Sequence, residues 1–143
     1  MGPYRVFPGR LSVCRTFGDC EAKVLALGGM KGVVTCEPEI HYDQDGVNKY
    51  DYILIGSDGI FDKMKNEQIN QIVWDVATFQ RSKHLNAGPG TNVTPATLHQ
   101  VCGLVADEIL HAAAKSRSLD NLSIVFIAFK SFKNYIEQIL SSS

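Results

Sequence analysis

Two aspartates, Asp58 and Asp120, stand at the ends of two strongly apolar runs. Asp58 closes the run that begins at Tyr52, and Asp120 opens the run that continues to Phe129. If these runs are neighbouring antiparallel strands, the end of one lies beside the start of the other. Both carboxylates then fall on one edge of a sheet, whereas parallel pairing would separate them by a strand length of roughly 20 Å.

Such a pair of carboxylates suits a divalent cation. Two carboxylates on one edge repel each other unless a cation sits between them. Aspartate oxygens without a histidine or cysteine nearby favour a hard cation such as Mg²⁺ or Mn²⁺. Each pair alone has a simpler interpretation, because Asp58-Gly59 is a common turn and Asp120-Asn121 can open a strand as a turn. The apolar residues before Asp58 favour the metal interpretation, since they bring its carboxylate out of the core.

Other candidate residues give weaker signals. Arg15 and Asp19 are more consistent with an ion pair that fixes a strand-to-loop corner than with direct chemistry. The four histidines are scattered along the chain. The four cysteines form no Cys-x-x-Cys pair, so we expect no zinc site and reduced thiols in a cytoplasmic or nuclear protein.

Size and charge restrict the possible classes of protein. The 143 residues are enough for one domain with a hydrophobic core. Lysine and arginine total 14, aspartate and glutamate total 15, and no basic run occurs. We therefore expect no nucleic-acid partner and no membrane partner. No apolar stretch approaches the length of a membrane span.

Hydrophobic periodicity and turn residues predict the elements that position the two aspartates. Strands are expected over 10–15, 33–36, 51–57 and from 122 to 129, with the 51–57 strand central and covered on both faces. Helices are expected over 66–79, capped by Asn66, over 95–115, and over 131–140, with a surface loop at 80–94. Two successive helices between strands favour an α+β fold with an antiparallel sheet in a single domain, 1–143.

Four motifs in order then resemble a known family. They are Arg10-Leu11-Ser12-Val13-Cys14-Arg15-Thr16-Phe17-Gly18-Asp19, Glu37-Pro38-Glu39, Ser57-Asp58-Gly59-Ile60-Phe61-Asp62 and Ser118-Leu119-Asp120-Asn121-Leu122-Ser123. Together they resemble the metal-dependent protein phosphatases of the 2C type over about residues 5 to 130. Cys14 departs from the pattern, because the family usually has serine there.

The resemblance implies a fold, an activity and a set of site residues. The fold would be an antiparallel β-sandwich flanked by helices, of which this chain holds the C-terminal portion. The activity would be hydrolysis of phosphoserine and phosphothreonine in a phosphoprotein substrate, by a water activated at a two-metal Mg²⁺ or Mn²⁺ site. Asp58 and Asp120 would bind metal, and no catalytic residue is expected beyond the metal ligands. Asn121 would orient a neighbouring carboxylate, and Gly59, Arg15 and Asp19 would have supporting or structural roles.

The family's upstream Asp-Gly-His-Gly-Gly motif and its early phosphate-binding arginine have no counterpart here. The only Asp-Gly pairs are Asp45-Gly46 and Asp58-Gly59, and neither is followed by histidine. The isolated chain is therefore expected to be incomplete or inactive. An uncovered sheet face would favour self-association or pairing with the missing N-terminal half.

Three hypotheses about function stay open at this point. The chain is part of an active phosphatase, or an inactive phosphatase-like binding or scaffolding module. In the third, the aspartates are turn residues of an unrelated β-rich structural domain, which four ordered motifs disfavour.

Overall fold

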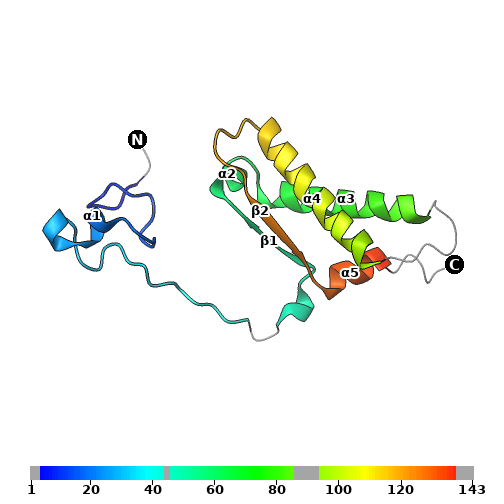
Figure 1. Ribbon diagram of the computed structural model, residues 1–143, viewed down its shortest axis with the longest axis horizontal. Coiled ribbons are helices and arrows are strands. Elements are labelled where there is room, and N and C mark those ends of the chain that lie inside the picture. The colour runs from blue at the N-terminus through cyan, green and yellow to red at the C-terminus, as the bar shows by residue number, and fades with distance from the viewer. Residues whose placement is uncertain (1–3, 44–45, 86–93, 138–143) are drawn as a thin grey trace. The chain divides into compact units, whose positions relative to one another are not determined.

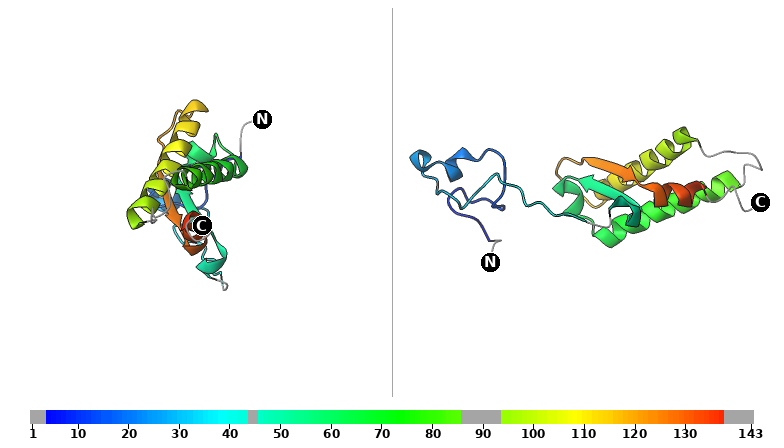
Figure 2. Two further views of the ribbon diagram at one scale, coloured as in Figure 1. Left: turned by 90° about the vertical axis from the view of Figure 1, so that its right-hand side faces the viewer. Right: turned by 90° about the horizontal axis from the view of Figure 1, so that it is seen from below.

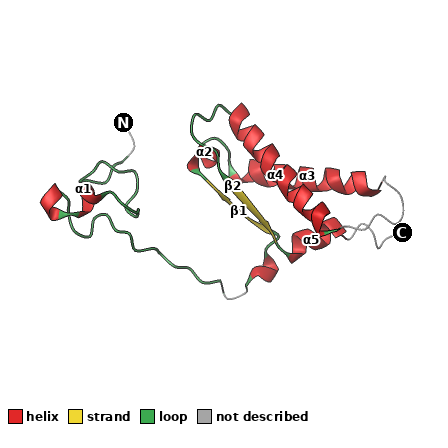
Figure 3. Ribbon diagram, in the orientation of Figure 1, coloured by secondary structure: helices red, strands yellow, loops and turns green. Residues whose placement is uncertain are grey.

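The chain forms two compact units, Met1–Asp43 and Gln44–Ser143, called below the N-terminal unit and the C-terminal unit. The computed structural model describes residues 4–43, 46–85 and 94–137. Helices and strands both occur (Figure 1, Figure 3), which confirms the predicted α+β class. That the two units belong to one partial domain stays a prediction.

The N-terminal unit consists mostly of turns and loops. It contains a short helix α1 (Cys20–Lys23) and a 3₁₀ turn η1 (Leu25–Leu27). The strands predicted over 10–15 and 33–36 are wrong, because these segments form only the isolated bridges Val6↔Leu11 and Arg15↔Thr35. A β-pattern becomes a strand only where one partner segment continues the hydrogen-bonded ladder. Here Leu11 and Arg15 each form a single bridge, and each bridge is to a different segment.

The C-terminal unit begins with the 3₁₀ turn η2 (Val47–Lys49) and is built on two strands, β1 (Tyr52–Gly56) and β2 (Ile124–Ala128). The strands pair antiparallel, with a register that runs from Tyr52↔Ala128 to Gly56↔Ile124. This confirms the antiparallel pairing predicted for the two apolar runs. The sheet has two strands in the described part of the chain, so the predicted sandwich is not formed there.

In its described part, the C-terminal unit also contains four helices: α2 (Asp58–Phe61), α3 (Asn66–Leu85), α4 (Pro95–Lys115) and α5 (Lys130–Glu137). The bounds of α4 match the prediction, and Thr94 caps it by accepting a hydrogen bond from the backbone of Thr97. The first residue of α3 is Asn66 itself, and the preceding amide, that of Lys65, donates to Gln68 Oε1 at 2.9 Å.

Two predicted boundaries need correction or lie partly outside the described residues. The loop predicted at 80–94 is wrong over 80–85, which continue α3, and 86–93 lie outside the described residues. The helix continues because residues 80–85 include no glycine or proline. The next glycine along the chain is Gly88. The predicted helix over 131–140 is described as α5 up to Glu137, and its remaining three positions lie outside the described residues.

The helices pack against one face of the sheet, and this layer encloses the hydrophobic core (Figure 2). The largest fully buried side chains of this unit are Phe132, Ile60, Ile109, Ile136, Val73, Val101 and Val105. Phe132 lies at the centre of an aromatic group, with ring centroids 5.5 Å from Phe126 and 5.7 Å from Trp74.

No helix within the described segments is long and apolar enough to cross a bilayer.

The opposite face of the sheet carries four exposed aliphatic side chains. They are Ile53, Ile55, Val125 and Ile127. They pair across the two strands, Ile53 with Ile127 and Ile55 with Val125. The prediction that β1 is covered on both faces is therefore wrong for the described residues of the C-terminal unit, because these four side chains are exposed.

Candidate active site at one end of the sheet

The segments that carry Asp58 and Asp120 emerge at the same end of the two-stranded sheet. Gly56, the last residue of β1, pairs with Ile124, the first residue of β2. Asp58 therefore lies just beyond the end of β1, and Asp120 lies shortly before the start of β2. Their segments come close together, because a Cβ built on Gly59 would lie 3.3 Å from the Cβ of Asp120.

Ser57 joins the two segments through three hydrogen bonds. Its amide donates to the carbonyl of Ser123 at 3.0 Å. Its hydroxyl donates to the carbonyl of Asn121 at 2.8 Å and accepts from the amide of Ser123 at 3.1 Å. The hydroxyl is thus satisfied as both donor and acceptor, and it holds the start of the Asp58 turn against the segment that follows Asp120.

Ser118 makes a second connection, from the segment that leads to Asp120 back to the segment that follows Asp58. Its partly buried hydroxyl donates to the carbonyl of Gly59 at 2.8 Å. Sequence analysis did not assign roles to Ser57 or Ser118. The available signal was their position, since each lies within two residues of one of the aspartates.

Gly59 is buried where the two segments touch. A Cβ at this position would lie 2.6 Å from the carbonyl oxygen of Asn121 and 3.1 Å from a side-chain methyl of Leu122. Contacts this short with backbone leave no room for a side chain. Gly59 therefore allows the close approach of the Asp58 and Asp120 segments.

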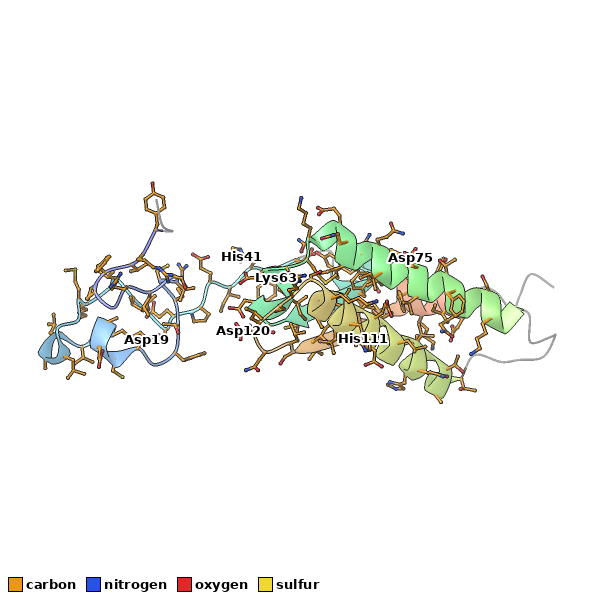
Figure 4. All side chains as sticks on the ribbon, turned by 90° about the horizontal axis from the view of Figure 1, so that it is seen from above. Asp19, His41, Lys63, Asp75, His111 and Asp120 are labelled. Atoms are coloured by element: carbon orange, nitrogen blue, oxygen red, sulfur yellow. The ribbon has the colours of Figure 1, made fainter. Side chains whose placement is uncertain are left out.

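The two aspartates are exposed at this end of the unit. Asp120 accepts a hydrogen bond on Oδ1 from the backbone amide of Asn121, at 2.7 Å (Asp120 is labelled in Figure 4). The contact that orients this carboxylate thus comes from the main chain of Asn121. Asp58 lies in the first turn of α2. Neither aspartate forms an ion pair with another residue in the described segments.

In the N-terminal unit, the predicted ion pair between Arg15 and Asp19 is wrong. Arg15 instead pairs with Glu39, with 2.5 Å between Nη2 and Oε1. The bridge Arg15↔Thr35 explains this choice, because it brings Arg15 alongside the segment that leads to Glu39. Asp19 precedes α1 in a left-handed conformation, with φ 48°, and makes no side-chain cap.

Comparison with known proteins identifies the family. A family model described as protein phosphatase 2C matches residues 5–122. The chain belongs to the protein phosphatase 2C family. The match includes Asp58, Gly59, Asp120 and Asn121, so both aspartates lie within the matched region, which ends just before β2.

Similar proteins are 2C-type phosphatases of greater length. Protein phosphatase 1A of Mus musculus is 32% identical over 124 residues, which are 86% of this chain and 28% of the relative. Protein phosphatase 1B of Bos taurus is 30% identical over 122 residues, 85% of this chain and 21% of the relative. Protein phosphatase ppm-1.A of Caenorhabditis elegans is 29% identical, also over 122 residues, 22% of its length. No solved structure matches the chain.

This 2C-family chain therefore spans less than a third of those relatives, and its ligand set for a metal is partial. No group of three or more histidine, cysteine, aspartate or glutamate side chains in the described segments could hold a metal ion. The two carboxylates are hard oxygen donors of the kind that Mg²⁺ and Mn²⁺ prefer. They would supply two of the roughly six oxygens of a Mg²⁺ shell.

Proposed function

We propose that the chain is part of a metal-dependent protein phosphatase that hydrolyses phosphoserine and phosphothreonine. The observation that carries this proposal is the convergence of the Asp58 and Asp120 segments at one end of the β1–β2 sheet, within a chain of the 2C family. Their exposure supports it as well, because both carboxylates can meet ligands and substrate supplied from outside the unit.

Asp58 and Asp120 would hold Mg²⁺ or Mn²⁺ together with ligands from the rest of the complete domain. In two-metal sites, the bound cations lower the pKa of a water nucleophile and neutralise charge on the phosphoryl group. Other residues of the chain would position these two carboxylates. The amide of Asn121 fixes one oxygen of Asp120, and the hydroxyls of Ser57 and Ser118 hold the two segments at a constant separation.

We also propose that the exposed face of the sheet is covered in the complete protein, which would give the β-sandwich expected from the family. The four side chains Ile53, Ile55, Val125 and Ile127 form a contiguous apolar face. Burial of apolar area contributes about 25 cal/mol per Å². The isolated chain should therefore self-associate at micromolar concentration, or bind the missing half supplied in trans. Light scattering with and without that half tests this, and a clean monomer would contradict it.

A direct test of the activity uses the longest natural protein that contains this chain. We expect its reading frame to encode an upstream Asp-Gly-His-Gly-Gly segment and its product to hydrolyse a phosphothreonine peptide only when Mn²⁺ or Mg²⁺ is present. Hydrolysis that persists unchanged in excess EDTA would contradict metal dependence. A product that lacks both the segment and the activity would favour the scaffolding alternative.

A further inference from the structure

A groove runs between α3 and α4 in the C-terminal unit, with a volume of about 400 Å³. Its floor is formed by the half-buried side chains of Ile72, Val76 and Leu104. These residues lie one position before the core residues Val73, Ala77 and Val105 on their helices. The groove therefore has a second apolar stripe of α3 on one side and Leu104 of α4 on the other, beside the residues that pack in the core.

One wall of the groove is an aromatic ring that the fold leaves open. Phe79 lines the groove and is 66% exposed. It lies three residues after Val76 on α3, so its side chain extends the same helical stripe. An exposed ring beside a half-buried aliphatic floor is a surface that gains from contact with another apolar group.

Among the described residues, the charged ones that line the groove are acidic. Asp75 projects from α3 and Glu108 from α4, one on each helix, and the remaining polar lining residue is the neutral Gln80. Asp75 accepts a hydrogen bond from Gln71 at 2.8 Å, which leaves its negative charge in place. Within the described segments, neither carboxylate forms an ion pair. The groove thus combines an apolar floor with a negative rim.

We infer that this groove binds a segment of a partner protein that presents one large apolar side chain flanked by lysine or arginine. The apolar side chain would lie on Ile72, Val76 and Leu104 against the ring of Phe79. The flanking cations would lie near Asp75 and Glu108. The volume is at the lower end of the range of about 300–1,000 Å³ typical of ligand pockets, which suits a single anchoring side chain. The binding mode is that of a short segment laid between two helices.

Charge favours this occupant over a second copy of the chain. A two-fold contact of the groove with itself would bring Asp75 and Glu108 opposite the same two residues of the other copy. Like charges across an interface weaken it. Basic residues at the same positions would be attracted instead. The inference is independent of the proposed phosphatase activity, because Asp75 lies along α3 and Asp120 beyond the end of the sheet (Figure 4).

The test measures binding of a fluorescein-labelled peptide to the full chain by fluorescence anisotropy. The peptide carries a tryptophan between two pairs of arginines. We expect saturable binding at micromolar protein that weakens as salt is raised, since exposed charges are screened. A matched peptide with glutamate in place of arginine, and another with alanine in place of tryptophan, should bind at least tenfold more weakly.

Variants of the chain then locate the site. Phe79→Ala should weaken binding about tenfold, because it removes the aromatic wall. Glu108→Gln should weaken it about two- to fivefold, as expected for one exposed ion pair. Asp107→Asn is the matched control, since Asp107 is exposed on the same helix and does not line the groove. Circular dichroism checks that each variant keeps its helices.

Three results would overturn the inference. The first is absence of saturable binding to the tryptophan–arginine peptide. The second is equal weakening by Asp107→Asn and Glu108→Gln, which would show attraction to overall charge. The third is loss of self-association in Phe79→Ala, measured by light scattering, which would assign the groove to a second copy of the chain.

Discussion

The C-terminal unit encloses a hydrophobic core, whereas the N-terminal unit leaves most of its large apolar side chains exposed. In the C-terminal unit, β1, β2 and the helices bury side chains such as Phe132, Ile60 and Ile109 completely. In the N-terminal unit, the buried hydrophobic residues are Ala22 and Val34. Its larger apolar side chains are exposed, among them Phe17, Leu25, Leu27, Met30, Ile40 and Tyr42.

The difference shows that a segment can match the family without forming a hydrophobic core of its own. The 2C-family match covers residues 5–122, so it includes nearly all of one unit and much of the other. Only the C-terminal unit layers helices on a sheet, which is the arrangement that lets a short chain bury apolar surface. The N-terminal unit thus matches the family while most of its large apolar side chains are exposed.

The largest effect expected from this comparison is on stability. Phe132→Ala should lower the free energy of unfolding by about 3–5 kcal/mol, because it empties a fully buried site among aromatic rings. Phe17→Ala removes a ring that is 90% exposed and should change it by less than about 0.5 kcal/mol. Urea titration followed by circular dichroism measures both. A comparable loss from Phe17→Ala would mean that the N-terminal unit has a core of its own.

The next largest effect is expected on the proposed phosphatase activity, to which substitutions in the two units should contribute unequally. In the complete phosphatase domain, Asp58→Asn should reduce Mn²⁺-dependent turnover of a phosphopeptide about a hundredfold or more, since the amide lacks the charge that a hard cation requires. Asp120→Asn should behave alike. Arg15→Ala should cost far less, because Arg15 is engaged in an exposed ion pair with Glu39 and exposed pairs contribute little.

Asp107→Asn serves as the charge control for these variants and should retain full turnover. Full activity of Asp58→Asn at saturating Mn²⁺ would remove Asp58 from the metal site. A loss in Arg15→Ala as large as that in Asp58→Asn would place the N-terminal unit in the chemistry. Calorimetric titration of the isolated chain with Mn²⁺ should show weak or absent binding, because its ligand set is partial.

Substitution of two glycines, one in each unit, should have a smaller effect on stability and allows a matched comparison of the units. A Cβ on Gly59 or on Gly29 would lie 2.6 Å from a backbone atom. Gly59→Ala should lower the stability of the C-terminal unit by about 1–3 kcal/mol, because it forces the Asp58 and Asp120 segments apart. Gly29→Ala should leave the main thermal transition unchanged, since the strain falls in the N-terminal unit.

Gly103→Ala is the control for these two variants. Gly103 lies within α4, and nothing lies within 4 Å of an added Cβ. The substitution should raise stability by about 0.5–1 kcal/mol. Melting temperatures measured by circular dichroism order the three variants, and a main transition lowered equally by Gly29→Ala and Gly59→Ala would show that the two units unfold together.

The smallest effect concerns the reactivity of the cysteines. Cys14, Cys20 and Cys36 are exposed in the N-terminal unit, whereas Cys102 is half-buried on α4. Burial raises the pKa of the Cys102 thiol above its ordinary value. At a given pH, less of it is the reactive thiolate, so iodoacetamide should modify it last.

The raised pKa of the Cys102 thiol also makes the stability of the chain depend on pH. The folded chain holds the Cys102 proton more tightly than the unfolded chain. This contribution to stability is therefore present at neutral pH and is lost as the pH rises through the thiol's folded pKa. Mass spectrometry of alkylated peptides between neutral and alkaline pH measures the order of modification. Early modification of Cys102 would show that α4 opens readily.

Several elements followed from sequence because their signals are local. Thr94-Pro95 and an apolar stripe with helical spacing predicted α4 within its observed bounds, and two apolar runs predicted β1 and β2 as antiparallel neighbours. A cap or a periodic stripe depends on residues only a few positions apart. The predictions at 10–15 and 80–85 failed because a strand needs a distant partner and a helix continues until a breaker stops it.

The sequence by itself indicated that Asp58 and Asp120 lie at the ends of two strands, and it favoured antiparallel pairing, which the structure confirms. Only the tertiary structure decided how their segments are joined. The Ser57–Asn121 hydrogen bond connects residues 64 positions apart. The space that requires glycine at position 59 is set by the backbone at Asn121. Arg15 pairs with Glu39 because a bridge brings that segment alongside. Such contacts depend on how distant segments pack, which no local pattern encodes.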